Sequence, residues 1–264
     1  MWNADKIVYR NDDSFVRAYQ GGELVWEKPS SNNKIFYTST DGQIVNPHRI
    51  DVFGSNIISN TYSEGVGIIE FDGDVTKIGY TAFSYCNTLQ TIVIPDSVTS
   101  IGENAFFTCN RLTSITIPNG VTSINIGVFE NCSSLTTITI PDGVTSIGQV
   151  AFYGCTSLTS ITIPNGVTSI DIGVFERCTS LISITIPFSV RDIEYNAFKD
   201  CNQLSEVIVN AVIPPNLYPE QNTGIYNQFE NNAPGRLIKV PAASLQKYKT
   251  ASGWSVYANS IVSQ

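Results

Sequence analysis

The fold is decided by residues 155–177, which read C-T-S-L-T-S-I-T-I-P-N-G-V-T-S-I-D-I-G-V-F-E-R and are followed by Cys178. The same order of residue types returns every 23 residues along this part of the chain. Cysteine keeps the step at Cys86, Cys109, Cys132, Cys155, Cys178 and Cys201. Phenylalanine keeps it at Phe83, Phe106, Phe129, Phe152, Phe175 and Phe198, and leucine at Leu89, Leu112, Leu135, Leu158, Leu181 and Leu204. This constant period predicts stacked supersecondary units, because each unit can bury its apolar face only against its neighbours.

Each repeat contains the signals of two short extended runs and a return. Leu158, Ile161 and Ile163 alternate with polar residues, which predicts a short strand with one buried face. The turn residues at 164–166 end that strand, and a second extended run follows at 167–170. Residues further on carry the chain back with the phenylalanine pointing inward. The sequence therefore predicts a mostly β protein, a parallel β-solenoid with 23-residue coils.

The repeated blocks also resemble a known family. L-T-S-I-T-I-P, V-T-S-I-G and A-F-x-x-C are similar to the BspA-like (Treponema-type) leucine-rich repeats of bacterial surface proteins. The resemblance covers about Ile69 to Pro241. It implies a right-handed, curved parallel β-solenoid with a role in adhesion or binding, and it brings no catalytic residues to carry over.

The pattern divides the chain into four parts. They are an N-terminal β-hairpin unit at 1–30, a linker and N-terminal cap at 31–68, the leucine-rich-repeat solenoid at 69–241, and a C-terminal cap at 242–264. The first unit turns at Gly21-Gly22 and resembles hairpin segments of phage and prophage tail-associated proteins. It is too short to bury much surface alone, so we expect it to pack on a partner, on another copy in an oligomer, or on the next segment.

The ends of the repeat carry more detailed expectations. In the N-terminal cap we expect a hairpin of Lys34–Thr38 with Gln43–Val45, and then a degenerate coil in which Asn60 and Ser63 replace phenylalanine and cysteine. From 66 to 241 we expect one continuous parallel solenoid of about eight coils.

The C-terminal end departs from the period. Phe229 arrives eight residues late, which predicts an insert within 214–228 that forms a surface loop because of its Pro and Gly residues. In the C-terminal cap we expect a short helix at 244–248, with Tyr248 and Trp254 packed on the last coil.

The cysteines are predicted to be free and buried. Six cysteines would allow three disulfides, but each occupies the same position of its coil and none has a unique partner. A buried thiol packs as a small hydrophobe, and parallel inward side chains disfavour bridges between coils.

Composition restricts the partners. The net charge of −8 offers no basic stripe for nucleic acid, and no apolar run is long enough for membrane insertion. The first thirty residues lack the apolar core of a signal peptide. Two locations stay open: the cell surface or the exterior if a signal peptide was trimmed, and otherwise the cytoplasm or a virion.

Catalytic and metal chemistry are not predicted. The single histidine, His48, follows Pro47 and is interpreted as a solvated loop residue. Asp72 and Asp74 flank Gly73 as in an ordinary turn, and no further calcium ligands follow. No catalytic residue, metal site or cofactor is therefore expected, and the protein is interpreted as a non-enzyme.

The candidate binding residues are hydroxyl side chains on the outer face of the first strand. They are Ser114, Thr116, Thr137, Thr139, Ser160, Thr162 and Thr185. Three interpretations stay open: β-propensity and packing on a solvated sheet, a face that binds a protein or glycan on a cell surface, and an ice-binding threonine array. Tyr218 and Tyr226 in the insert are added as aromatic contacts.

The resulting functional hypothesis is a binding or adhesion module of a bacterial or phage surface that uses one face of the solenoid. The alternative is a structural virion or tail-associated protein with a receptor-binding role, for which the N-terminal hairpin unit is the sequence signal.

Overall fold

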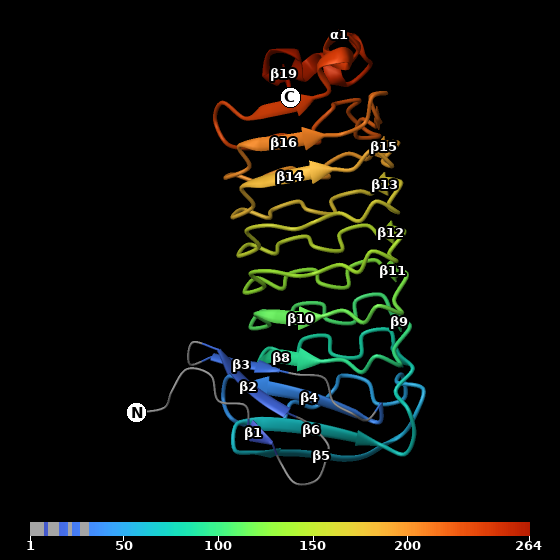
Figure 1. Ribbon diagram of the computed structural model, residues 1–264, viewed down its shortest axis with the longest axis vertical. Coiled ribbons are helices and arrows are strands. Elements are labelled where there is room, and N and C mark those ends of the chain that lie inside the picture. Colours follow the sequence, from blue (N-terminus) through green and yellow to red (C-terminus); the bar gives the residue numbers. More distant parts are fainter. Residues whose placement is uncertain (1–7, 10–15, 21–22, 27–31) are drawn as a thin grey trace.

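The computed structural model describes residues 8–9, 16–20, 23–26 and 32–264. Most of this chain runs in coils that stack along one axis, with the C-terminal helix α1 (Leu245–Thr250) at one end (Figure 1). Each coil adds a short segment to each of two parallel ladders. The prediction of a mostly β, parallel solenoid of about eight turns is confirmed.

The first ladder contains the run that begins after each buried leucine. Its strands are β8 (Leu89–Val93), β10 (Ser114–Thr116), β14 (Ser183–Ile186), β16 (Glu206–Val209), β18 (Leu237–Val240) and β19 (Ile261–Ser263). Ser114 pairs with Thr91, which is one repeat step of 23 residues earlier. Between β10 and β14 the coils are joined by parallel bridges, Thr116 to Thr139 and Thr137 to Ser160.

The second ladder contains the shorter run that follows the turn. Its two-residue strands are β7 (Lys77–Ile78), β9 (Ser100–Ile101), β11 (Ser123–Ile124), β12 (Ser146–Ile147), β13 (Ser169–Ile170), β15 (Asp192–Ile193) and β17 (Asn216–Leu217). The inward residue of each strand is an aliphatic side chain with at most 6 % exposure. The two ladders therefore bury their aliphatic residues in one shared interior.

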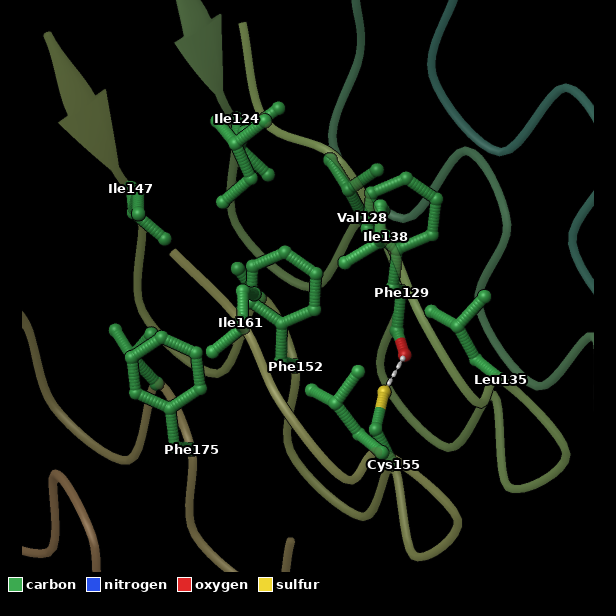
Figure 2. Packing of buried hydrophobic residues seen from close by; sticks show 14 of the residues in the cluster. Ile124, Val128, Phe129, Leu135, Ile138, Ile147, Phe152, Cys155, Ile161 and Phe175 are labelled. Atoms are coloured by element: carbon green, nitrogen blue, oxygen red, sulfur yellow. Dashed lines mark hydrogen bonds between the residues drawn. The ribbon is translucent and has the colours of Figure 1, made fainter. Parts of the chain in front are cut away.

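A column of aromatic rings runs through that interior. Phe106 stacks on Phe83 with ring centroids 5.5 Å apart and planes inclined by 4°. The same stacking continues to Phe229, and Figure 2 shows Phe129, Phe152 and Phe175 in this column. All six repeat phenylalanines are at most 1 % exposed, which confirms the predicted register.

The six cysteines are free and buried, as predicted. Their thiols also have a backbone partner that the sequence analysis did not foresee. Cys155 Sγ donates to the carbonyl of Phe129 at 3.2 Å (Figure 2), and the contact recurs from Cys109 to Cys201. Each of these five thiols thus connects one coil to the coil before it, while Cys86 donates to the carbonyl of Asn46 in the cap.

The N-terminal cap differs from the prediction. Strand β4 (Lys34–Ser39) lies between β6 (Val66–Phe71) and β8 and is antiparallel to both, while β5 (Ile57–Ser63) forms the outer edge. The predicted hairpin with 43–45 is wrong, because that segment is irregular. The degenerate coil is also wrong, since Asn60 belongs to an antiparallel strand.

The inserted strand also changes where the parallel stack begins. Ile69 and Phe71 keep the repeat step to Ile92 and Ile94, yet β6 pairs with β4 and not with β8. The expectation of continuous parallel pairing from 66 is therefore wrong for this ladder, which becomes parallel at β8. Phe53 closes the aromatic column, with its ring 5.6 Å from Phe83.

The C-terminal end also differs in two places. Residues 216–217 form β17 and pair with β15, so the surface loop begins after Leu217 and not at 214. The cap contains η1 (Ala242–Ser244), α1 and η2 (Trp254–Ser260), and the chain then adds β19 beside β18. Tyr248 and Trp254 are fully buried, as predicted.

The N-terminal strands are antiparallel. β2 (Val16–Gln20) pairs with β1 (Val8–Tyr9) and with β3 (Glu23–Trp26), and Gln20 lies opposite Glu23. The predicted turn at Gly21-Gly22 lies outside the described residues.

Candidate binding surface

The candidate residues of the first ladder lie together on its outer surface. We call this set the Ser/Thr face: Ser114, Thr116, Thr137, Thr139, Ser160, Thr162 and Thr185, all of which are exposed. Between them, Ile115, Ile138 and Ile161 point into the core with at most 8 % exposure. The alternation follows from strand geometry, in which successive side chains point to opposite sides of the sheet.

The hydroxyl groups of this face are available. Within the described residues, no side-chain hydrogen bond involves any member of the Ser/Thr face. The adjacent column behaves differently, because Thr113 and Thr136 donate their hydroxyls to backbone carbonyls of the preceding coil at 3.1 and 3.3 Å. Hydroxyls in one column hold coils together, whereas those of the Ser/Thr face point to solvent.

The Ser/Thr face is uncharged, and charge returns on the strands beyond it. Lys239 and Glu206 form an ion pair across β16 and β18, on the C-terminal side. Lys34 and Glu70 form another at 3.5 Å across β4 and β6, on the N-terminal side. Exposed pairs like these contribute about 0–1 kcal/mol to stability. The face itself can therefore offer hydrogen bonds without attracting either sign of charge.

The two insert tyrosines lie elsewhere. Tyr218 follows β17 in the second ladder, is 42 % exposed, and donates its hydroxyl to Asp192 Oδ1 at 3.2 Å. The hydrogen bond and the charge of Asp192 raise the pKa of Tyr218. Tyr226 is half-buried against the cap, with its hydroxyl 3.3 Å from Ser252 Oγ. A ligand that touched both the Ser/Thr face and Tyr218 would have to reach from one ladder to the other.

An acidic group beside Tyr218 was missed by the sequence analysis. Burial raises the pKa of Glu194, and the neighbouring charges of Asp171 and Asp192 add to the shift. Asp192 also accepts a hydrogen bond from Asn216 Nδ2 at 2.8 Å. The signal in the sequence was the replacement of the second-run serine by Asp192, which falls one repeat step after Ser169.

The structure offers no metal centre among the residues it describes, where no group of three or more His, Cys, Asp and Glu side chains could hold an ion. His48 is exposed. Asp72 accepts hydrogen bonds from the backbone and side chain of Asn56, both at 2.8 Å, and these lower its pKa. Asp72 therefore stabilises a turn.

No helix in the described part of the chain has the length and apolar character needed to cross a membrane.

Stacked coils with buried leucine, phenylalanine and cysteine columns define a leucine-rich-repeat solenoid. The family model for the BspA type leucine rich repeat region matches residues 76–205 in six copies. The chain belongs to the BspA-type leucine-rich repeat family. A search of curated proteins found no match.

The chain is also similar to solved structures. A leucine-rich repeat protein of T. pallidum is 30% identical with a TM-score of 0.52, over 59% of this chain and 72% of that one. A leucine rich cell surface protein of Faecalibacterium prausnitzii is 30% identical with a TM-score of 0.43, over 60% of this chain and 51% of that one. A Bacteroides ovatus leucine-rich repeat protein is 22% identical with a TM-score of 0.46, over 91% of this chain and 64% of that one.

Proposed function

We propose that this chain is a non-enzymatic binding module that recognises a protein or a glycan through the Ser/Thr face, at a bacterial or phage surface. The observation that carries the proposal is the contrast between two hydroxyl columns. The hydroxyls of Thr113 and Thr136 donate to backbone carbonyls, whereas Thr116 and Thr139 are exposed and their hydroxyls can bond to solvent. Exposed hydroxyls can donate and accept hydrogen bonds, which suits an uncharged polar ligand.

Regular spacing strengthens the proposal. Successive coils of a parallel ladder lie ~4.8 Å apart, so the hydroxyls form rows with a fixed step. Parallel pairing and isolated bridges join neighbouring coils and hold these rows in place, which limits the entropy lost when a ligand binds. A repeating glycan or an extended protein segment can contact several coils at once. The bacterial or phage surface is proposed because the repeat blocks resemble those of bacterial surface proteins.

The test replaces Thr116, Thr139 and Thr162 together by Lys in the full chain. Binding of the labelled protein is measured on an array of glycans and extracellular-matrix proteins. We expect the signal of bound partners to fall at least tenfold, because three long cations cover the hydroxyl rows. The matched control replaces Thr122, Thr145 and Thr168, which are exposed on the second ladder, by Lys. It adds the same charge and should leave binding unchanged.

Two results would oppose the proposal. Equal losses in both triple variants would show a general effect of charge, and full binding by the first variant would place the contact elsewhere. Thermal unfolding of each variant, followed by circular dichroism, separates lost binding from lost folding.

The alternative function is a structural virion or tail-associated part. The antiparallel pairing of β2 with β3 favours it, because it fits the hairpin segment that the sequence resembles. Virion association would then occur through the N-terminal strands, and removal of residues 1–30 would abolish incorporation while leaving the Ser/Thr face intact.

A further inference from the structure

A pocket of about 370 Å³ lies where the N-terminal cap meets the first repeat. It is formed by the irregular segment 44–48 on one side and the turn 84–88 on the other. This volume falls within the ~300–1,000 Å³ of typical small-ligand sites. We call it the Tyr85 pocket. It is separate from the Ser/Thr face, whose residues do not line it.

The wall of the pocket is held in place from the core side. Val45 donates its backbone N–H to the Tyr37 hydroxyl at 3.1 Å, and its carbonyl accepts from Asn60 Nδ2 at 3.0 Å. The backbone N–H of His48 donates to the carbonyl of Ala82 at 2.8 Å. Tyr37, which accepts the first of these bonds, is only 1 % exposed, so that bond ends on a buried group. The pocket is therefore preformed, which reduces the entropy cost of binding.

Tyr85 occupies a backbone position that is unsuited to it. The equivalent position of every coil has a positive φ: Tyr85 61°, Thr108 57°, Asn131 60°, Gly154 69°, Arg177 60°, Asp200 59° and Asn231 55°. Asn, Gly and Asp tolerate this conformation well, whereas a bulky side chain is unfavourable there. Tyr85 is nevertheless present, and it is 58 % exposed. Thr108 and Arg177 adopt the same conformation in other coils, so Tyr85 is distinguished by its aromatic ring and by its position in the lining of the pocket.

The Tyr85 ring is also oriented. Phe107, on the next coil, contacts it edge-to-face, with centroids 5.2 Å apart and planes inclined by 85°. Such pairs fix the plane of the ring as well as adding contact energy. The pocket thus presents a fixed aromatic ring to solvent.

Much of the remaining lining is polar, and it includes the imidazole of His48. Asn46, Asn87 and Thr88 supply amide and hydroxyl groups that can both donate and accept, and no Lys, Arg, Asp or Glu lines the pocket. Ile44 adds apolar surface and is 44 % exposed. The lining therefore holds no carboxylate to pair with an ammonium group and no Lys or Arg to pair with a phosphate.

We infer that the Tyr85 pocket binds a neutral sugar ring. A pyranose carries one face of C–H groups, which packs on an aromatic ring, and a rim of hydroxyls, which pairs with amides and hydroxyls. The Tyr85 pocket provides both surfaces in one preformed site. The inference does not depend on the proposed function, because no residue of the Ser/Thr face takes part.

The test measures saturation-transfer NMR between the full chain and four probes, the methyl glycosides of glucose, galactose, mannose and N-acetylglucosamine. We expect at least one probe to receive saturation on its ring C–H protons. The key variant is Tyr85→Asn. Asparagine occurs naturally at the equivalent position of another coil, as Asn131, where it has the same positive φ. The variant's affinity for that probe should fall at least tenfold, while the melting temperature stays equal or rises.

The matched control is Arg177→Asn, which makes the same kind of backbone replacement four coils away. It should relieve similar strain and leave sugar binding unchanged. The inference is overturned if none of the four probes binds the wild-type chain, if Tyr85→Asn binds as well as wild type, or if both variants lose binding equally. Triple Lys substitution of Thr116, Thr139 and Thr162 should not affect this signal, which separates it from the proposed function.

Discussion

The thiol of Cys155 donates a hydrogen bond to the backbone carbonyl of Phe129, 3.2 Å away and 26 residues earlier in the chain. The same contact is repeated at the neighbouring coils, so the cysteine and phenylalanine columns are coupled to each other. A cysteine here fills a small apolar space and also donates to a turn carbonyl that accepts the N–H of Cys132 as well. This double role explains why one small residue type suits every coil.

The burial of the thiols predicts slow and ordered chemical labelling. Cys86 is 8 % exposed and the other five cysteines are 0 % exposed, so Cys86 should react first with an alkylating reagent. Burial raises the pKa of every thiol and thereby suppresses the reactive thiolate. Mass spectrometry of the native protein should show five unmodified cysteines until denaturant is added. Rapid modification of all six, or a mass deficit of paired hydrogens, would contradict this prediction.

The same burial predicts a loss of stability at alkaline pH. Burial raises the pKa of Cys86 and of Cys201 from 9.0 to about 12. The unfolded chain therefore releases these protons first, so their contribution is complete below pH 9.0 and is lost as the pH rises towards about 12. The free energy of unfolding, from urea titrations, should decline through this range.

A variant assigns that decline to the thiols. Cys155→Ala removes one buried thiol, so its unfolding free energy should fall less steeply with pH, by about 1.4 kcal/mol per pH unit. Buried tyrosines with raised pKa values, such as Tyr248, act equally in both proteins and cancel in the comparison. Thr116→Ala, at an exposed position, serves as the control and should keep the wild-type slope. Equal slopes for Cys155→Ala and wild type would contradict the assignment.

The aromatic column predicts a large difference between two phenylalanines. Phe152 is fully buried and stacks on Phe129 and Phe175 at 5.5 and 5.6 Å, whereas Phe188 is 61 % exposed. Phe152→Ala should lower the free energy of unfolding by about 3–5 kcal/mol, because it opens a cavity between two rings. Phe188→Ala should change it by about 0.5 kcal/mol or less. Urea unfolding measures both, and similar losses would contradict the packing described here.

The insert is predicted to tolerate change only beyond its first residues. The N–H of Tyr218 donates to the carbonyl of Ile193 at 3.1 Å, and the carbonyl of Tyr218 accepts from Gln228 Nε2 at 2.6 Å. Deleting 218–220 should therefore lower the melting temperature by several degrees. Deleting 221–224, which are exposed, should leave it unchanged. Equal melting temperatures for the two deletions would contradict this view of the loop.

The Tyr218 side chain also distinguishes the two classes of partner. It lies on a different ladder from the Ser/Thr face, so Tyr218→Ala should leave the affinity for a single glycan chain on that face unchanged. A protein partner is large enough to contact both ladders and should bind more weakly to this variant. Surface plasmon resonance with a partner identified on the array measures the difference.

The sequence by itself determined the repeat and its core. A strict 23-residue step in cysteine, phenylalanine and leucine is sufficient to predict stacked coils, because every coil then makes the same contacts with its neighbours. The free state of the six thiols followed from the same symmetry. The hydroxyl rows of the Ser/Thr face could also be read from the sequence, since an alternating strand has one outer side.

Only the tertiary structure decided the strand pairing in the two caps and which side-chain hydroxyls are free of intramolecular hydrogen bonds. Strand β4 inserts between β6 and β8, and the chain returns as β19 beside β18. Both pairings depend on contacts that occur once and leave no periodic signal in the sequence. The repeat pattern cannot show that the Thr113 hydroxyl bonds to the backbone while the Thr116 hydroxyl does not. The pattern also cannot show that the segment 44–48 and Tyr85 line the same pocket. Periodicity specifies the contacts between successive coils because those contacts repeat. The contact between a cap and its coil occurs only once, so its strand pairing is determined by the packing of the folded chain.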